Sequence, residues 1–279
     1  MAKIVLTGVE GSVANCLRRA PTLRKFTWLL CLSPLGLCAQ PQIGGGTCSS
    51  ASLSGMYSVT LSGRDVSSSL NFSKILQGIG TATFDGLSKV SFVLTNNTNQ
   101  AAGVSQTFSG TYSLQANCVG VMNITTGDTA SFTLEAYNLG KNYLITGQDG
   151  TYSFAGSGGT LPASCTTGTL SGTYAFNGNG FPLSSGSIAG VNTISGLLTF
   201  NGGGTVTSTW YVAANGSVTT ITTSGEYMVG AGCTGSAAVT DSTAHTYTLL
   251  FTVTSTNGSN FLVSGSDSQL MFTGSGRLL

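Results

Sequence analysis

The sequence predicts an all-β protein made of two tandem antiparallel up-and-down β-barrels with eight strands each. Three observations support this: apolar and polar residues alternate with period two, Asn-Gly and Asp-Gly pairs separate the alternating segments, and the second half of the chain repeats the first. In "HTYTLLFTV", Tyr247, Leu249 and Phe251 alternate mainly with threonines, which is the pattern of a half-buried strand. Closure into a barrel removes exposed strand edges, and two-sheet β-sandwiches are the alternative architecture.

The internal duplication defines the domains. "CSSASLSGMYSV" matches "CTTGTLSGTYAF", and the offset is 117 residues from Tyr57 to Tyr174 and 115 from Cys118 to Cys233. The repeat is far longer than the roughly 20 to 50 residues of a solenoid unit, so it indicates two complete domains. The predicted domains are a first barrel over residues 48–158, a linker over 159–164 and a second barrel over 165–279.

The strands follow from the alternating segments and the turn residues between them. "FDGL", "FNGG", "ANGS" and "TNGS" place Asn-Gly or Asp-Gly where a two-residue loop needs positive φ. Strands are expected at residues 54–62, 79–84, 89–94, 105–115, 119–125, 130–136, 142–147 and 151–156 in the first barrel. In the second they are expected at 171–178, 194–200, 205–213, 217–229, 235–240, 245–255, 260–266 and 269–275. Longer loops are expected at residues 64–80 and 179–190.

Residues 1–39 have the features of a secretory signal. Basic residues precede an apolar run from Phe26 to about Leu37, and small residues follow it, as in exported precursors. The run has about 12 residues, too few to span a bilayer as a helix. We therefore predict cleavage after Ala39 and a linker over residues 40–47.

Two alternatives concern the same region. The first 16 residues are unlike a signal, so translation is expected to start near Leu17. A lipoprotein signal that uses Cys38 is the alternative to simple cleavage. With either start and either type of signal, we expect an exported bacterial protein that is extracellular, periplasmic or held at the cell surface.

The cysteine pattern predicts two disulfides. Removal of the signal leaves four of the seven cysteines, two in each repeat at matching places. A unit that folds alone is expected to carry its own bridge, so we predict the pairs Cys48–Cys118 and Cys165–Cys233. Each closes a loop of about 70 residues and contributes on the order of 4 kcal/mol. Four free buried thiols are the alternative.

Composition argues against two classes of function. Charged residues are 7% of the chain, against about 25% in ordinary soluble proteins. Beyond residue 39 there are five basic and eight acidic residues, a net charge of −3, and no basic stripe that would bind nucleic acid. Most expected strands are shorter than the roughly 9 to 11 residues of a membrane-spanning strand. We expect neither nucleic-acid binding nor a membrane-spanning barrel.

No catalytic, cofactor or metal site is predicted. Gly230, Gly232 and Gly235 match G-x-G-x-x-G, but an alternating strand pattern follows them where a dinucleotide site needs a helix. His245 is the only histidine, and the first repeat has Asp128 in its place, so a structural role at the barrel rim is expected. The cysteines lack the spacing of zinc ligands.

Several phrases resemble a known group of proteins. "LSGTYAF", "LTFNGGGTV", "GEYMVGAGCTG" and "HTYTLLFTV" resemble repeated domains of uncharacterised exported proteins of soil bacteria, which are similar to the allene oxide cyclase barrel. The resemblance covers about residues 48–279 and rests mainly on turn glycines and strand aromatics. It implies a calycin-like barrel whose interior is packed or holds an apolar ligand. No position matches a catalytic motif of allene oxide cyclase, a plant enzyme, so none of its catalytic residues is assigned to this chain.

Three functions remain open. The favoured one is an exported non-enzymatic module that acts through surface contacts with a glycan or a protein. The second is a carrier of a small apolar ligand in the barrel interior, and the third is an enzyme on a calycin-like barrel. The candidates for ligand lining are the inward-facing Tyr112, Phe132, Tyr227, Leu249 and Phe251, for which plain core packing is the alternative.

Overall fold

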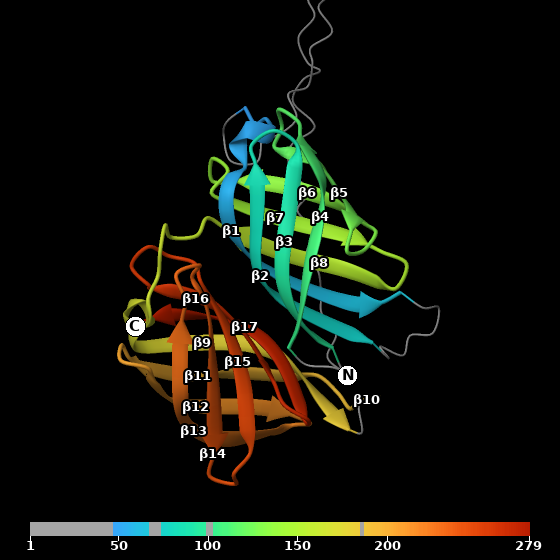
Figure 1. Ribbon diagram of the computed structural model, residues 1–279. Coiled ribbons are helices and arrows are strands. Elements are labelled where there is room, and N and C mark those ends of the chain that lie inside the picture. The colour runs from blue at the N-terminus through green and yellow to red at the C-terminus, as the bar shows by residue number, and fades with distance from the viewer. Residues whose placement is uncertain (1–46, 67–73, 99–102, 185–186) are drawn as a thin grey trace, which may run out of the picture. The chain divides into compact units, whose positions relative to one another are not determined.

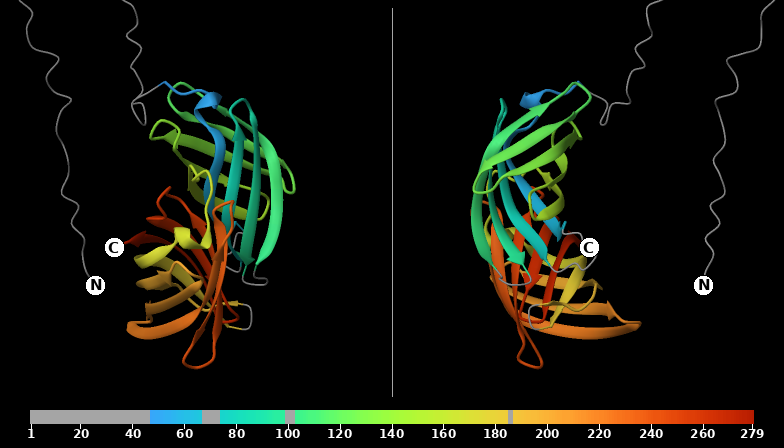
Figure 2. Two further views of the ribbon diagram at one scale, coloured as in Figure 1. Left: turned by 60° about the vertical axis from the view of Figure 1, so that its left-hand side comes forward. Right: turned by 90° about the vertical axis from the view of Figure 1, so that its right-hand side faces the viewer.

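The computed structural model describes residues 47–66, 74–98, 103–184 and 187–279 (Figure 1). The predicted signal over residues 1–39 and nearly all of the linker that follows it lie outside these residues. The described chain forms two closed antiparallel β-barrels in tandem, which confirms the predicted fold class over the β-sandwich alternative. Figure 2 shows each barrel from two further sides. Among the described residues, no helix has the length and apolar character needed to cross a membrane.

The first barrel contains eight strands in sequence order. A short 3-10 helix, η1 (Ser50–Ser52), precedes them. Each strand pairs with the next, and β8 returns to pair with β1, which closes the barrel. The strands are β1 (Ser54–Asp65), β2 (Ile75–Asp85), β3 (Lys89–Thr98), β4 (Val104–Leu114), β5 (Val119–Thr126), β6 (Ala130–Tyr137), β7 (Asn142–Gln148) and β8 (Tyr152–Gly159).

The second barrel repeats this arrangement with one addition. The two-residue strand β10 (Ser187–Ile188) pairs only with the end of β9, and pairing of β17 with β9 closes the barrel. A 3-10 helix, η2 (Thr167–Thr169), again comes first. The other strands are β9 (Ser171–Ser184), β11 (Asn192–Asn201), β12 (Thr205–Ala214), β13 (Ser217–Val229), β14 (Thr234–Asp241), β15 (Thr246–Val253), β16 (Asn260–Ser266) and β17 (Leu270–Leu278).

Both long loops expected from the sequence are shorter than predicted. β2 starts at Ile75, so the glycine-rich stretch before residue 81 is strand rather than loop. A Cβ atom at Gly80 would lie 2.0 Å from the carbonyl oxygen of Val93 on β3. Glycine here therefore allows the two paired strands to approach each other closely. In the sequence alone, a glycine-rich stretch of this kind looks like a loop. β9 likewise continues to Ser184.

One end of each barrel is plugged in the same way. Leu53 follows η1 and is fully buried, and the Tyr112 hydroxyl donates hydrogen bonds to the carbonyl oxygens of Ser50 and Leu53 at 2.9 and 2.8 Å. In the second barrel, the Tyr227 hydroxyl bonds the equivalent carbonyls in and after η2 at 3.0 and 2.7 Å. Because these hydroxyls are satisfied by backbone acceptors, both tyrosines can be buried. We call this end of each barrel the plugged end.

Both predicted disulfides are present at the plugged ends. Cys48 bonds Cys118 across 70 residues, and Cys165 bonds Cys233 across 68 residues. Each ties the segment before the 3-10 helix to the turn after the fourth strand of its barrel. Two disulfides indicate folding in an oxidising compartment.

Candidate ligand-binding cavity

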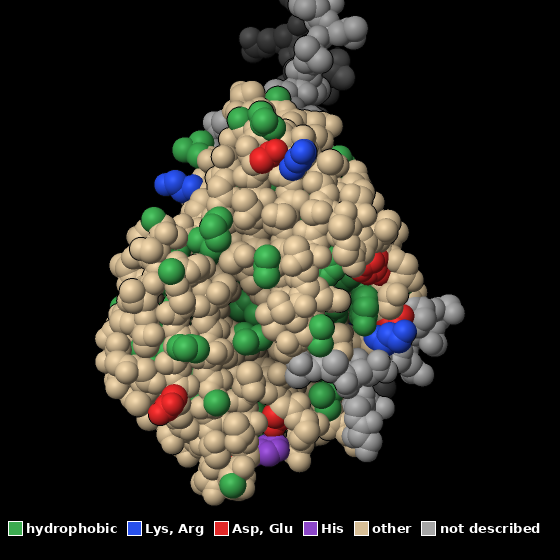
Figure 3. Space-filling model, viewed as in Figure 1, with side chains coloured by type: hydrophobic (Ala, Val, Ile, Leu, Met, Phe, Trp, Pro, Cys, Tyr) green, Lys and Arg blue, Asp and Glu red, His purple; other side chains and the backbone are tan. Residues whose placement is uncertain are grey.

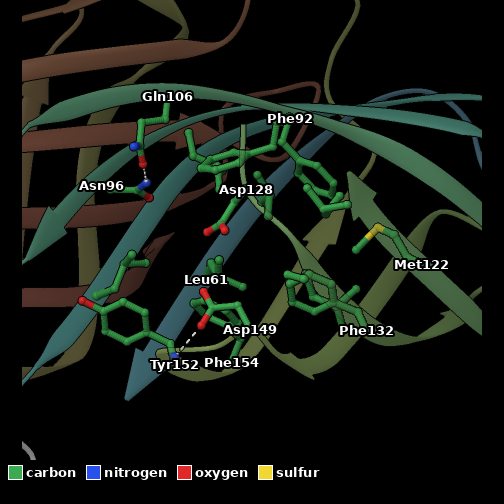
Figure 4. Close-up of a pocket in the computed structure, with 17 residues that line it drawn as sticks. Leu61, Phe92, Asn96, Gln106, Met122, Asp128, Phe132, Asp149, Tyr152 and Phe154 are labelled. Atoms are coloured by element: carbon green, nitrogen blue, oxygen red, sulfur yellow. Dashed lines mark hydrogen bonds between the residues drawn. The ribbon is translucent and has the colours of Figure 1, made fainter. Parts of the chain in front are cut away.

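The first barrel contains a partly open cavity of about 90 Å³ away from its plugged end (Figure 4). All eight strands contribute to its lining, which is mainly apolar. Buried apolar side chains such as Phe92, Met122 and Phe154 form its walls. An apolar cavity of about 150 Å³ binds benzene, so this one has room for roughly four or five carbons of an alkyl chain rather than for a whole ring.

Two positions at the cavity have smaller side chains in the first repeat than in the second. Val90 and Val206 occupy equivalent places in the matching hairpins, and the same offset aligns Leu94 with Trp210. Ala130 aligns with Tyr247, because each lies four residues before the partner of an equivalent glycine on the preceding strand. At these two positions the first barrel has Leu94 and Ala130, where the second has aromatic rings.

In the second barrel these rings fill the corresponding space. Trp210 is fully buried, and its ring centroid lies 5.0 Å from that of Tyr247 and 5.5 Å from that of Phe272. Phe176 contacts the same indole with the centroids 6.2 Å apart. These edge-to-face contacts are typical of well-packed aromatic clusters, so this part of the second barrel is a core.

A buried amide lies at the cavity wall. Asn96 is 3% exposed, and its Nδ2 donates a hydrogen bond to Gln106 Oε1 at 2.7 Å. Its Oδ1 has no hydrogen-bond partner among the residues that the structure describes. Buried polar atoms are normally paired, so this acceptor points to a missing donor.

Two carboxylates line the same cavity from neighbouring turns. Asp149, after β7, accepts backbone N–H bonds from Thr151 and Tyr152, both at 2.5 Å, and Figure 4 marks the second of these. Asp128, after β5, accepts the backbone N–H of Thr129 at 2.6 Å. Burial raises the pKa of Tyr152 above its usual value of 10.0, and the negative charges of Asp149 and Asp65 raise it further. These charges give the wall a negative potential.

The residues predicted to line a ligand site are all buried, but they fall in different places. Phe132 lines the cavity. Tyr112 lies at the plugged end of the same barrel, where its hydroxyl donates hydrogen bonds to backbone carbonyls. Tyr227, Leu249 and Phe251 belong to the core of the second barrel.

The polar residues of the cavity wall were not predicted. Asn96 follows Val90, Phe92 and Leu94 on the inward-facing side of β3. A polar residue at an inward position of an alternating strand is a signal that the sequence contains. Asp128 gives a weaker signal, because turn aspartates commonly hydrogen-bond their own backbone.

His245 lies at the position in the second barrel that corresponds to Asp128. Its Nδ1 is 3.0 Å from Oδ2 of Asp267, whose side chain is 4% exposed. The imidazole also packs edge-on against Tyr247, with ring centroids 5.4 Å apart. Burial and the charges of Asp267 and Asp241 raise the pKa of Tyr247 to about 12, so the phenol stays protonated near neutral pH. These contacts fit the expected structural role.

The remaining surface has few charged groups. On the face shown in Figure 3, charged side chains are sparse and hydrophobic side chains are scattered. Within the described residues, no group of three or more His, Cys, Asp and Glu side chains could hold a metal ion.

The fold and the cavity define a protein of tandem β-barrels, the first with an apolar cavity and the second with a cluster of aromatic rings at the corresponding place. No protein-family model matches the chain, and no curated protein matches it.

Proposed function

We propose that the protein is an exported binding protein whose first barrel takes up a small apolar ligand, while the second barrel is a filled structural domain. The apolar cavity of about 90 Å³ in the first barrel carries this proposal. Small-molecule sites are concave and mostly apolar with a few placed polar groups, and the cavity has this character on a smaller scale. Export is supported by the signal-like N-terminal region and by the two disulfides.

Because of the cavity, we place the carrier of a small apolar ligand before the surface-contact module among the possible functions. The sequence favours a surface-contact module, whereas the cavity favours a ligand-binding protein. The surface module and the enzyme remain predictions, as does the resemblance to calycin-like barrels. Only the first barrel is proposed to bind a ligand, because aromatic rings occupy the equivalent space in the second.

The size of the cavity limits the affinity that apolar contact can give. Each buried methylene contributes about 0.8 kcal/mol, so four or five of them give about 3 to 4 kcal/mol. This corresponds to a dissociation constant in the millimolar range. A neutral six-carbon alcohol, hexan-1-ol, is therefore a suitable probe of the apolar site.

We expect hexan-1-ol to bind in the millimolar range and Ala130→Leu to weaken this binding roughly tenfold or more. Ala130 is buried and lines the cavity, and the added three carbons would occupy the space that the probe needs. Overpacking itself costs about 1 to 3 kcal/mol, so the barrel should stay folded. A two-dimensional NMR titration of the full chain would give the dissociation constants and show whether the fold is kept.

Ala213→Leu is the matched control, since it makes the same change at an exposed position of β12. It should leave the affinity unchanged. Equal weakening by both variants, or no binding of hexan-1-ol to the unaltered protein, would contradict the proposal and move the search to surface partners. Native mass spectrometry of protein purified from its own host would then look for a natural adduct.

A further inference from the structure

The polar atoms that face the cavity differ in how many of their possible hydrogen bonds they form. Asn96 Nδ2 and Gln106 Oε1 satisfy each other, whereas Asn96 Oδ1 is buried and has no partner among the described residues. The two aspartates accept backbone N–H bonds through Oδ1, and a carboxylate has a second oxygen with further acceptor capacity. Apart from the amide N–H groups of Asn96 and Gln106 and the Tyr152 hydroxyl, the polar side-chain groups of the wall are acceptors. Acceptors require donors on a ligand.

Negative charge predominates at this end of the barrel. Asp65, Asp128 and Asp149 lie at the ends of β1, β5 and β7, and two of them line the cavity. The described cations nearest to Asp65 in the chain are Arg64 and Lys74, and Lys141 is the nearest to Asp149, at the opposite end of β7. All three are exposed and none lines the cavity. Burial raises the pKa of Tyr152, and the negative charges of Asp149 and Asp65 raise it further, because both carboxylates lie near this phenol at the same end of the barrel.

The second barrel lacks this arrangement. Asp267 is equivalent to Asp149, but His245 replaces Asp128 and lies 3.0 Å from Asp267. The acidic pair occurs in the first barrel, and an acid-base pair occurs at the same place in the second. The pair of carboxylates therefore occurs together with the cavity and is not a feature of the fold that both barrels share.

We propose that the ligand of the first barrel is a small cationic amphiphile, with an apolar body in the cavity and a protonated amine that bonds Asn96 Oδ1 and the carboxylates of Asp128 and Asp149. An ammonium group has three donors and no acceptor, so it matches a wall of acceptors. Its hydrogen bonds to carboxylates are charge-assisted and stronger than those of a neutral hydroxyl. The inference rests on the proposed apolar site and specifies the chemistry of its ligand.

Hexylamine, hexan-1-ol and hexanoate test this inference because they share one apolar chain and differ in the head group. In NMR titrations of the full chain at pH 7, hexylamine should bind roughly tenfold or more tightly than hexan-1-ol, as expected for one charge-assisted hydrogen bond. Hexanoate should bind most weakly, because carboxylates repel it. Added salt should reduce the preference for the amine, since partly exposed charges are screened.

The double variant Asp128→Asn/Asp149→Asn should lose the preference for hexylamine and keep its affinity for hexan-1-ol. Asparagine retains an acceptor for the backbone N–H groups that each aspartate binds. Asp85→Asn is the matched control, because Asp85 accepts three backbone N–H bonds in the turn before Lys89, at the plugged end of the same barrel. That variant should behave as the unaltered protein.

The outcomes separate the two proposals. Equal affinity for hexylamine and hexan-1-ol, or tightest binding of hexanoate, overturns the cationic ligand and leaves the apolar site standing. Persistence of the amine preference in the double variant also overturns it. If none of the three probes binds, both proposals fail.

Discussion

Replacing Trp210 by alanine is expected to lower the free energy of unfolding of the second barrel by about 3 to 5 kcal/mol, the usual cost of removing a large buried aromatic side chain. The indole is fully buried and contacts the rings of Phe176, Tyr247 and Phe272. Its Nε1 has no acceptor among the described residues, so the substitution also removes an unpaired donor. The loss should therefore fall in the lower part of that range.

Chemical denaturation followed by far-UV circular dichroism would measure the loss. Fluorescence is unsuitable, because Trp210 is one of two tryptophans in the chain and the other, Trp28, lies in the predicted signal. Tyr211→Ala is the control: the adjacent side chain is 46% exposed, and its removal should change stability by no more than about 0.5 kcal/mol. Similar effects of the two substitutions would show that the second barrel does not depend on a ring-filled core.

The fold could be predicted because the sequence repeats its strand pattern and its turn chemistry in both halves. Alternation at Tyr247, Leu249 and Phe251 gave the inward side of β15, and all three are buried. The constant offset gave the number of barrels, and the paired cysteines gave both disulfides. These features are local or internal to the chain, so they need no knowledge of how distant strands pack.

The cavity could not be predicted because it depends on the summed volume of side chains from eight strands. Alternation places Leu94 and Trp210 inside their barrels in the same way. Whether the space is filled depends on all the side chains around it, and these include Ala130 and Tyr247, which lie on strands far away in sequence. For the same reason, inward position alone could not separate Phe132, at the cavity, from Tyr112, at the plugged end.

The second large effect is expected from the disulfides. Replacing Cys48 and Cys118 together by alanine should lower the free energy of unfolding of the first barrel on the order of 4 kcal/mol. The bridge spans 70 residues, and its main effect is to restrict the unfolded chain, whose entropy rises when the loop is opened. Because the second bridge spans 68 residues, Cys165→Ala/Cys233→Ala should cost the second barrel nearly the same amount.

Calorimetry of the two double variants would test this equality, with the reduced unaltered protein as a control that loses both bridges without any substitution. A much smaller loss in one barrel would mean that its plugged end is held by other contacts, such as the hydrogen bonds of Tyr112 or Tyr227 to backbone carbonyls. The Cys48–Cys118 bridge lies at the plugged end, away from Asp128 and Asp149 at the cavity. The first double variant, while folded, should therefore bind hexan-1-ol as tightly as the unaltered protein, which would separate the stability of the barrel from the binding capacity of its interior.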